Sequence, residues 1–210
     1  AQITLVEPDE YHANLETIKQ RIFADLKEQG FRPYWVPTGA SMPVGAAGYV
    51  GCAGEIALFE ARAGFAFDAV VFATGSGGTA AGLLVGAAIH ALKARIIGIN
   101  TGEPAEQLRA ETIRIANGCA QLLGFKKRFE ASDVVIVDGF DAGGYGEIDQ
   151  QTIKTLKWFA ENEGLLLDLV YTAKAAAGLL GLLERGEFRS GDKVLFIHTG
   201  GLPSLFTHHD

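Results

Sequence analysis

The sequence predicts an α/β protein with a mostly parallel sheet and helices on both of its faces. Short apolar runs, typical of buried strands, alternate with longer stretches of helical periodicity along the 210 residues. Strands separated by helices of this length pair in parallel, because a parallel connection needs a crossover of roughly a dozen residues. Polar, glycine-rich loops also follow several strands, as they do in open α/β sheets that bind ligands.

The first elements follow from their apolar patterns. The run Ile3–Val6 predicts a strand, and apolar residues at helical spacing predict a helix over 8–30 with Gly30 just beyond its end. A second strand is expected at Pro33–Val36. A helix is then expected over 44–63, and the Ala and Gly residues of its first turns would allow another backbone or a ligand to approach closely.

The rest of the chain continues the same alternation. Further strands are expected at 69–73, 95–100, 134–137 and 193–198, and further helices at 79–92, 105–123, 148–163 and 173–185. Between them, an irregular glycine-rich loop over 138–146 holds a single tyrosine, Tyr145. No repeat or low-complexity segment interrupts the order, so residues 1–210 are expected to form one α/β domain.

Composition narrows the class of protein. A net charge of −7 argues against general binding to nucleic acid or to a membrane surface. The N-terminus shows no signal-peptide pattern. Cys52 and Cys119 lie far apart in different predicted helices, which favours buried free thiols in a reducing cytosol over a disulfide. We therefore expect a cytoplasmic protein.

The most informative stretch lies between the strand at 69–73 and the helix that follows it. Small residues occupy every position of this loop: Gly75, Ser76, Gly77, Gly78 and Thr79. Glycine lets backbone N–H groups turn inward, and the helix N-terminus adds unpaired N–H groups and a positive dipole end. A tight turn without a ligand is the alternative, but three glycines in four positions exceed what a turn needs. The pattern therefore favours a phosphate site.

Other polar loops should lie at the same rim of the sheet. Because ligands bind outside the carboxyl ends of parallel strands, these loops are expected to converge on a single cleft. The loops are 38–41, 74–79, 100–101, 138–145 and 199–201.

Two phosphate-bearing cofactors fit such a loop. The series Gly75-x-Gly77-x-x-Ala80 matches a variant of the dinucleotide fingerprint. That fingerprint requires an acidic residue at the end of the next strand to hold a ribose hydroxyl. Asn100 stands there instead, and Glu103 lies beyond the strand, so a dinucleotide is the weaker candidate. Pyridoxal phosphate, which needs a cradle for one phosphate, is the stronger.

Several stretches in order along nearly the whole chain resemble the D-cysteine desulfhydrase and 1-aminocyclopropane-1-carboxylate deaminase family. This family belongs to the fold-type-II pyridoxal-phosphate enzymes. The stretches are Gly39–Tyr49, Thr74–Thr79, Gly144–Gly146, Leu167–Lys174 and Val194–Gly201. The resemblance implies that the fold is that of the family's large domain and that the cofactor is pyridoxal 5'-phosphate.

The resemblance also implies roles for individual residues. Residues 75–79 would hold the cofactor phosphate. Tyr145 and Tyr171 match the two active-site tyrosines of the family, with matching separation, and one of them would help proton transfer. Without the resemblance, Tyr145 would be read as a loop tyrosine packing on the sheet, and for Tyr171 a tyrosine that finishes a buried strand would be an equal alternative.

Thr172 and Thr199 favour one branch of this family. The deaminase branch has an acidic residue and a leucine at these sites, whereas the desulfhydrase branch has two hydroxyl residues. A neutral hydroxyl beside the ring nitrogen suits β-elimination of a good leaving group. The resemblance therefore implies a carbon–sulfur lyase acting on a small amino acid such as D-cysteine and giving pyruvate, ammonia and sulfide. Capping of a helix or turn is the ordinary alternative for both threonines.

The Schiff-base lysine of the family has no counterpart here. The family carries it in an N-terminal Gly-Gly-Asn-Lys stretch, and Lys174 is a helix residue in the family pattern. The chain begins at Ala1 and matches the C-terminal, larger part of the family sequence. We expect the lysine to come from a partner chain or a missing segment. The alternatives are a non-catalytic phosphate- or amino-acid-binding subunit and a deaminase of 1-aminocyclopropane-1-carboxylate.

The remaining polar residues predict less. His198 at the end of a strand is expected to be a satisfied or supporting histidine in preference to a catalytic base. The tail His208–Asp210 lacks the further ligands that a metal site needs, so no metal is expected. The expected partners are a small amino-acid substrate and either further copies of the chain or a lysine-bearing partner.

Overall fold

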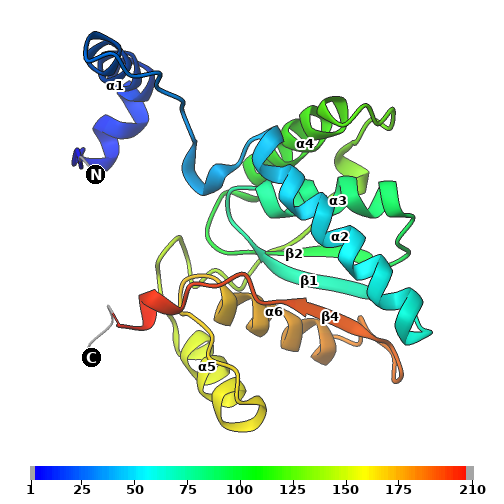
Figure 1. The fold of residues 1–210 in the computed structure, drawn as a ribbon. Coiled ribbons are helices and arrows are strands. Elements are labelled where there is room, and N and C mark those ends of the chain that lie inside the picture. The colour runs from blue at the N-terminus through cyan, green and yellow to red at the C-terminus, as the bar shows by residue number, and fades with distance from the viewer. Residues whose placement is uncertain (1–2, 207–210) are drawn as a thin grey trace. The chain divides into compact units, whose positions relative to one another are not determined.

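The computed structural model describes residues 3–206, and the chain divides into two compact units, Ala1–Val36 and Pro37–Asp210 (Figure 1). The first unit contains α1 (Pro8–Glu28), and the second contains the sheet and every predicted site residue. The prediction that 1–210 forms one cofactor-binding domain is not tested by this division and stays a prediction.

Helix α1 ends as its sequence predicts. Gly30 has φ +85°, in the left-handed region that glycine adopts without strain. The N–H of Gly30 bonds the carbonyl of Lys27 at 2.9 Å, and the N–H of Phe31 bonds the carbonyl of Leu26 at 3.0 Å. These two hydrogen bonds make a Schellman motif, which satisfies carbonyls that the last turn of a helix leaves unpaired.

The prediction of two strands in this unit is wrong. Residues 3–7 and 31–36 form no strand, and side chains such as Leu5 and Tyr34 are largely exposed, at 92% and 69%. An apolar, β-branched run predicts an extended segment, but a strand also needs a neighbour to pair with. The described part of this unit offers one helix and no such neighbour, so the segments remain unpaired.

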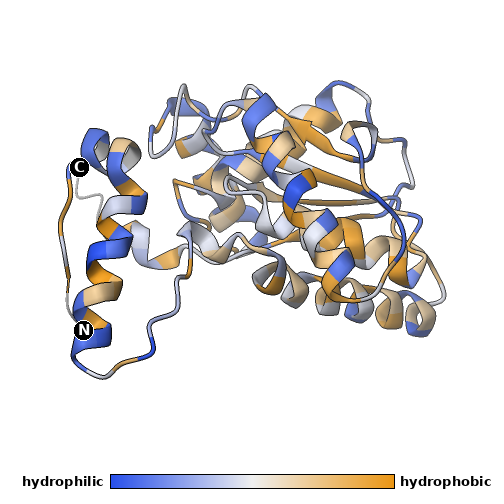
Figure 2. Ribbon diagram, turned by 90° about the horizontal axis from the view of Figure 1, so that it is seen from above, coloured by the Kyte–Doolittle hydropathy of each residue, from blue (hydrophilic) through white to orange (hydrophobic). Residues whose placement is uncertain are grey.

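The second unit is built on a four-stranded parallel sheet in the order β3-β2-β1-β4. Strand β1 lies in the interior of the sheet and is buried at every residue. Figure 2 shows the strands as mostly hydrophobic ribbon, typical of a sheet covered on both faces. These strands confirm the four predicted in this part of the chain: β1 (Ala69–Thr74), β2 (Arg95–Asn100), β3 (Val135–Val137) and β4 (Val194–Ile197).

Three helices cover one face of the sheet: α2 (Pro43–Ala63), α3 (Gly78–His90) and α4 (Ala105–Leu122). Glycines bring α2 and α3 together. A Cβ on Gly82 would lie 2.2 Å from the carbonyl oxygen of Ala46, and one on Gly86 would lie 2.5 Å from the Cβ of Ala53. The close approach predicted for the start of α2 is therefore made, and its partner is another helix backbone.

Helix α6 (Thr172–Glu184) covers the opposite face and packs its alanines on Val71 and Ile99 (Figure 1). Helix α5 (Gln150–Glu163) contacts α6 through Phe159. Helices on both faces confirm the predicted α/β class. No helix within residues 3–206 is long and apolar enough to cross a bilayer.

The order of the strands creates a reversal point beside β1. From β1 the chain advances through β2 to β3 in one direction, and β4 then returns to the other side of β1. The connecting helix α3 lies on one face and α6 on the other. In parallel sheets, ligands bind outside the carboxyl ends of the two strands that flank such a point. A ligand is therefore expected at the loops after β1 and β4.

Both cysteines are free thiols, as predicted. Cys119 is buried and Cys52 half-buried, and burial raises the pKa of each thiol above its ordinary value. Both thiols are therefore protonated at neutral pH.

Candidate cofactor site

The loop after β1 can be built only from very small residues. Gly77 has φ +81°, and a Cβ there would lie 2.8 Å from Thr112 Oγ1 on α4. A Cβ on Gly78 would lie 2.9 Å from Ser41 Oγ, and one on Gly75 would lie 3.0 Å from Thr101 Oγ1. Any side chain at these positions would push a neighbouring element away. The glycines are therefore required by tight packing from three sides as well as by the turn.

The loop also carries polar groups that the protein itself leaves unused. Within residues 3–206, no hydrogen bond engages the backbone N–H groups of Ser76, Gly77, Gly78 or Thr79. In the same described region, Thr74 Oγ1 at the end of β1 is buried without a hydrogen-bond partner. Helix α3 begins here without a side-chain cap. Free N–H groups at a helix N-terminus form a cradle for an anion such as phosphate.

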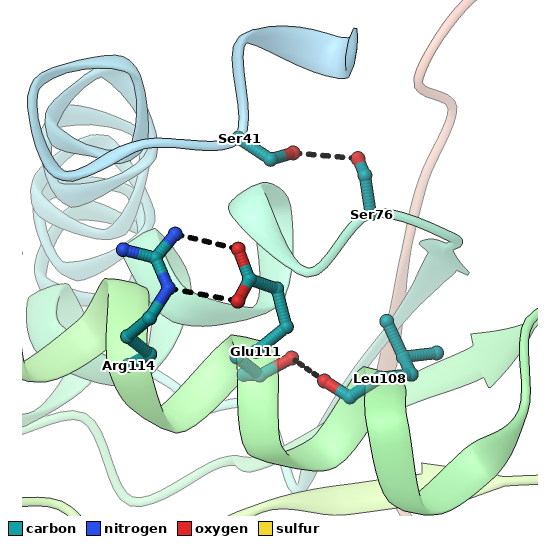
Figure 3. Close-up of polar contacts among 6 residues, drawn as sticks. Ser41, Ser76, Leu108, Glu111 and Arg114 are labelled. Atoms are coloured by element: carbon teal, nitrogen blue, oxygen red, sulfur yellow. Dashed lines mark hydrogen bonds and ion pairs between the residues drawn. The ribbon is translucent and has the colours of Figure 1, made fainter. Parts of the chain in front are cut away.

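Ser41 fixes the outer side of this cradle. It is buried, and its Oγ donates a hydrogen bond to Ser76 Oγ at 2.6 Å, as Figure 3 shows. Ser41 follows η1 (Thr38–Ala40), a short 3-10 helix, and not the strand that the sequence predicted. Its role could not be derived from the sequence, because 35 residues separate the two serines. The only available signal was its place among the polar loops at the rim.

The charged residues of α4 shown in Figure 3 pair with each other. Arg114 Nη2 contacts Glu111 Oε1 at 2.5 Å, and Arg114 Nε contacts Oε2 at 2.8 Å. Hydrogen bonds from Arg114 lower the pKa of the Glu111 carboxyl below its ordinary value. The guanidinium is thus occupied by a carboxylate in the protein. The groups that the described structure leaves unused at the predicted phosphate site are backbone N–H groups and the Thr74 hydroxyl.

The structure brings Tyr145 and Tyr171 together. Their phenolic oxygens are hydrogen-bonded to each other. The centroids of the two rings lie 5.9 Å apart, and the ring planes make an angle of 62°. Tyr145 is 58% exposed. Burial, and then the bond to Tyr145, raise the pKa of the Tyr171 hydroxyl well above its ordinary range. Tyr171 therefore stays a neutral phenol that shares a hydrogen bond with Tyr145.

Thr172 lies away from solvent. Its Oγ1 donates to Asp168 Oδ1 at 2.7 Å and accepts the N–H of Asp168 at 2.8 Å. Asp168 is itself fully buried and also accepts the N–H groups of Val170, Tyr171 and Thr172. The Thr172 hydroxyl is therefore engaged by Asp168 in the turn before α6. It does not cap the helix, whose N-cap is Tyr171 without a side-chain hydrogen bond.

Thr199 is exposed in the loop after β4, at the reversal point of the sheet. The turn at Gly200 and Gly201, both with positive φ, packs against Asp168, because a Cβ on Gly201 would lie 2.4 Å from Asp168 Cγ. Among the described residues, Thr199 and Thr172 share no hydrogen bond. The two threonines are linked only through Asp168 and this turn.

His198 is a satisfied histidine, as predicted. The N–H of Gly200 donates to its Nδ1 at 3.1 Å, and its Nε2 lies 2.8 Å from the carbonyl oxygen of Leu166. Because Nδ1 accepts a hydrogen bond, the proton resides on Nε2, which donates to Leu166. Both ring nitrogens thus hold the loop after β4 in place.

Asn100 is unsuited to hold a ribose. Its Nδ2 donates to the carbonyl of Glu103 at 2.6 Å and to Asp138 Oδ1 at 2.8 Å, and its Oδ1 accepts the N–H groups of Gly102 and Glu103. The whole amide is used in joining the loops after β2 and β3. Asn100 therefore has no free amide group with which to hold the ribose of a dinucleotide.

No lysine stands ready as a covalent anchor in the described chain. Lys174 is fully buried, and three backbone carbonyls occupy its Nζ. The other lysines of residues 3–206 are exposed, except Lys19 in the first unit, which pairs with Glu16 at 3.0 Å. Within the same residues there is no cluster of His, Cys, Asp and Glu that could hold a metal. The tail His208–Asp210 lies outside the described residues.

The second unit thus holds an unused anion cradle after β1, at the reversal point of the sheet, and a hydrogen-bonded tyrosine pair. The family model of pyridoxal-phosphate dependent enzymes matches residues 1–200. The chain belongs to this family. The recognition made from sequence motifs is thereby confirmed, and with it the α/β fold class and the family's cofactor, pyridoxal phosphate.

Relatives within the family carry two names. The chain is 42% identical over 184 residues to a D-cysteine desulfhydrase of Yersinia enterocolitica, covering 88% of this chain and 55% of the relative. It is 36% identical over 206 residues to a 1-aminocyclopropane-1-carboxylate deaminase of Methylobacterium nodulans, covering 98% of this chain and 61% of the relative. The chain thus spans little more than half the length of these relatives.

A solved structure gives the same result for the fold. The crystal structure of an ACC deaminase homologue superposes with a TM-score of 0.83 at 35% identity, covering 96% of this chain and 58% of that chain.

The residues of this chain fit pyridoxal phosphate. The cofactor's phosphate requires N–H and hydroxyl donors, and the loop 75–79 offers free N–H groups beside the unpaired Thr74 Oγ1. Space for it follows from the glycines, because side chains would fill the cradle. The predicted assignment of these five residues to the phosphate, and of the two threonines to the ring, stays a prediction.

Proposed function

We propose that this chain forms the phosphate-binding part of a pyridoxal-phosphate-dependent carbon–sulfur lyase. The reaction is β-elimination on a small amino acid such as D-cysteine, giving pyruvate, ammonia and sulfide. The observation that carries the proposal is the hydrogen-bonded pair Tyr145 and Tyr171, in the same unit as an anion cradle with unused donors. The D-cysteine desulfhydrase relative at 42% identity supports the choice of substrate.

The cofactor, when bound, supplies an electron sink that eases loss of a proton from the substrate α-carbon. Residues 75–79 would hold its phosphate through N–H groups and hydroxyls. Ser41 would orient the Ser76 hydroxyl toward this group, because the 2.6 Å hydrogen bond fixes the Ser76 rotamer. In this way the chain binds and orients the cofactor without a cationic side chain.

The tyrosine pair would move protons. Tyr171 holds its proton at neutral pH because burial opposes the phenolate, and the high pKa persists while Tyr145 donates to it or accepts from it. Tyr145, which is 58% exposed, can exchange protons with substrate or solvent. Tyr145 would therefore be the phenol that gives up or takes the proton, while Tyr171 keeps its own and supports the Tyr145 oxygen through the existing hydrogen bond.

The two threonines would have different roles. The Thr172 hydroxyl is committed to Asp168, and that contact supports the turn that follows Thr199. Thr199 remains exposed and is the hydroxyl that would face the ring nitrogen. A neutral hydroxyl at that nitrogen suits elimination of a thiol, whereas cyclopropane ring opening is more demanding.

The covalent lysine would come from a partner chain or from a further segment of a longer protein, because Lys174 is engaged elsewhere. We also propose a cytoplasmic location, which the two free cysteines support.

The test is to purify the protein under native conditions and to measure its intact mass, its visible spectrum and its activity on D-cysteine. We expect an absorbance band at roughly 410–430 nm, typical of lysine-bound cofactor, in a preparation that also contains a lysine-bearing segment or chain. Sulfide and pyruvate should form in equal amounts. A preparation with no band, no sulfide and only the 210-residue chain would overturn the lyase and leave a non-catalytic binding subunit.

A second candidate is deamination of 1-aminocyclopropane-1-carboxylate. The relative from Methylobacterium nodulans, which covers 98% of this chain, supports it. The same preparation should be offered this substrate and assayed for ammonia. Turnover of it in excess of D-cysteine would favour the deaminase.

Replacing Thr199 separates its role at the ring from cofactor binding. Thr199→Leu should lower kcat for D-cysteine about tenfold or more, with little change in cofactor affinity, because the phosphate contacts remain. Thr199→Ser, the matched control, keeps the hydroxyl and should retain most activity. Equal loss of turnover and of cofactor affinity in Thr199→Leu would contradict the role.

A further inference from the structure

Lys174 is an unusual residue for the interior of a protein. It lies on α6 among alanines and is fully buried, one of the largest fully buried side chains of the described chain. An ammonium group loses its hydration when buried and is tolerated only with compensating partners. Its position therefore indicates a specific role.

The partners of Lys174 are all backbone carbonyls. Its Nζ donates to the carbonyl oxygens of Asp141 at 2.7 Å, Gly144 at 2.9 Å and Thr101 at 3.2 Å. An ammonium has three protons, so each proton has one acceptor. The carbonyls belong to the loops after β2 and β3, which lie far apart in sequence. One cation thus ties α6 to two loops at the carboxyl edge of the sheet.

One of these carbonyls adjoins Tyr145. Gly144 precedes it in the chain, and the backbone there lies so close to Gly102 that a Cβ on Gly102 would be 2.2 Å from the Tyr145 nitrogen. Tyr171, the partner of Tyr145, lies three residues before Lys174 at the start of α6. The lysine therefore holds one tyrosine through the loop and the other through the helix.

Burial and the surrounding charges act in opposite directions on the pKa of Lys174, and burial has the larger effect. Burial lowers the pKa of Lys174, while Asp141, Asp149, Glu147 and Asp168 act in the opposite direction. Within the described chain these carboxylates make no hydrogen bond to Nζ, so the carbonyls define the geometry around the nitrogen.

We propose that Lys174 is a positioning residue whose ammonium serves as a built-in cation, organising the loop 138–146 and setting Tyr145 against Tyr171. Its effect on catalysis rests on the function proposed above, whereas its effect on the loop does not. A small monovalent cation in place of the ammonium would make the same contacts with carbonyl oxygens.

The first experiment compares Lys174→Met with the wild-type chain by hydrogen exchange. Loss of the charge with nearly the same side-chain length should raise exchange across 138–146 about tenfold or more, because the carbonyls lose their shared donor. Lys154→Met, at an exposed position on α5, is the matched control and should leave the loop unchanged. Unchanged exchange of the loop in Lys174→Met would overturn the proposal.

The second experiment tests whether charge or mere packing is responsible. Lys174→Ala leaves space for a small cation, so ammonium or potassium chloride should restore slow exchange across the loop, and tetramethylammonium chloride at equal ionic strength should not. Equal behaviour in all three salts, or a variant that folds in none of them, would overturn the proposal. A variant that folds only with the small cations would support it.

These measurements need neither cofactor nor substrate. If the wild-type preparation fails to act on D-cysteine, the proposed lyase falls, and the exchange data still decide the role of Lys174. If the preparation is active and the Lys174 variants leave hydrogen exchange across 138–146 unchanged, only the proposed role of Lys174 is refuted.

Discussion

Gly77 shows how one residue serves two constraints at the site. Its φ of +81° would strain any other residue, and its missing Cβ leaves room for Thr112 on α4. The first constraint belongs to the turn and the second to the packing of a separate helix. Loss of either would move the N–H groups that form the cradle.

We predict that Gly77→Ala destabilises the protein and weakens cofactor binding. The left-handed φ costs about 1–2 kcal/mol, and the 2.8 Å contact with Thr112 Oγ1 adds to this cost. Gly124→Ala is a matched control, because Gly124 has φ +69° and no atom within 4 Å of a Cβ. Urea unfolding and cofactor titration measure both effects.

The control separates backbone strain from packing. Gly124→Ala should lose stability through φ alone and keep its affinity for pyridoxal phosphate. If Gly77→Ala behaves in the same way, the loop does not hold the phosphate.

Asp168 and Lys174 show how buried charges are accommodated without a mutual ion pair. The carboxylate accepts N–H groups of its own turn, and the ammonium donates to carbonyls of distant loops. Most of these partners belong to the backbone, and Asp168 also accepts the hydroxyl of Thr172. Asp168 thereby holds the start of α6 next to Tyr171, and Lys174 holds the loop that carries Tyr145.

At the scale of elements, helix α5 offers a clear test of capping. Asp149 is its N-cap. Asp149 Oδ1 accepts two hydrogen bonds of 2.7 Å, one from the backbone N–H of Thr152 and one from its hydroxyl. The hydrogen bond from the Thr152 N–H is the main cause that lowers the pKa of Asp149. The carboxylate therefore stabilises the folded state while it is ionised.

We predict that Asp149→Ala lowers the free energy of unfolding by about 1 kcal/mol at pH 7. Because the folded-state pKa is depressed, the charged contribution is present above the unfolded value of about 3.9 and is lost as the pH falls through the lower folded value. The difference from wild type should therefore narrow below about pH 4. Urea unfolding at both pH values measures it.

Asp149→Asn keeps an acceptor at the N-cap and removes the titration. It should remain close to wild type at pH 7, and its difference from Asp149→Ala should persist in acid. A gap between wild type and Asp149→Ala that stays constant down to pH 3 would contradict the assignment.

The elements differ in how far the sequence could predict them. Strands such as β1 and β2 were predictable because they are interior strands and nearly all buried, so their apolar runs are long and unambiguous. The segments 3–6 and 33–36 have a similar pattern but no partner in the described structure. Pairing is a property of the tertiary fold, and a local pattern carries no information about it.

The same limit applies to the site. The glycine loop was predictable because three glycines and two hydroxyl residues are adjacent in sequence. The contacts of Ser41 with Ser76 and of Lys174 with Thr101 join residues 35 and 73 positions apart, so no local signal reveals them. One clue was available for Lys174, which is the only charged residue in the otherwise apolar stretch Thr172–Leu183.

On the scale of the whole second unit, β1 is the strand that we expect to resist local opening most strongly. Every residue of β1 is buried, and the strand is paired on both sides, by β2 and by β4. By contrast β3 lies at the edge, and Val135 is 46% exposed. Cooperative units of this kind open from their edges first.

We predict that the amides of Val70, Val71 and Phe72 exchange only through global unfolding, and that the amides of β3 exchange about tenfold or more faster. Native-state hydrogen exchange at low urea concentration measures both. If β3 were protected as strongly as β1, the sheet would have a partner along that edge.

The position of β4 has a consequence for biosynthesis. Ala69 of β1 pairs with Val194 of β4, which follows 125 residues later, so the ribosome must complete nearly the whole sheet before this pair can form. The phosphate loop and the first three strands emerge well before the turn that carries Thr199. The glycine loop and the turn that carries Thr199 are therefore synthesised at different times, and the contacts predicted for the cofactor can come together only late in synthesis.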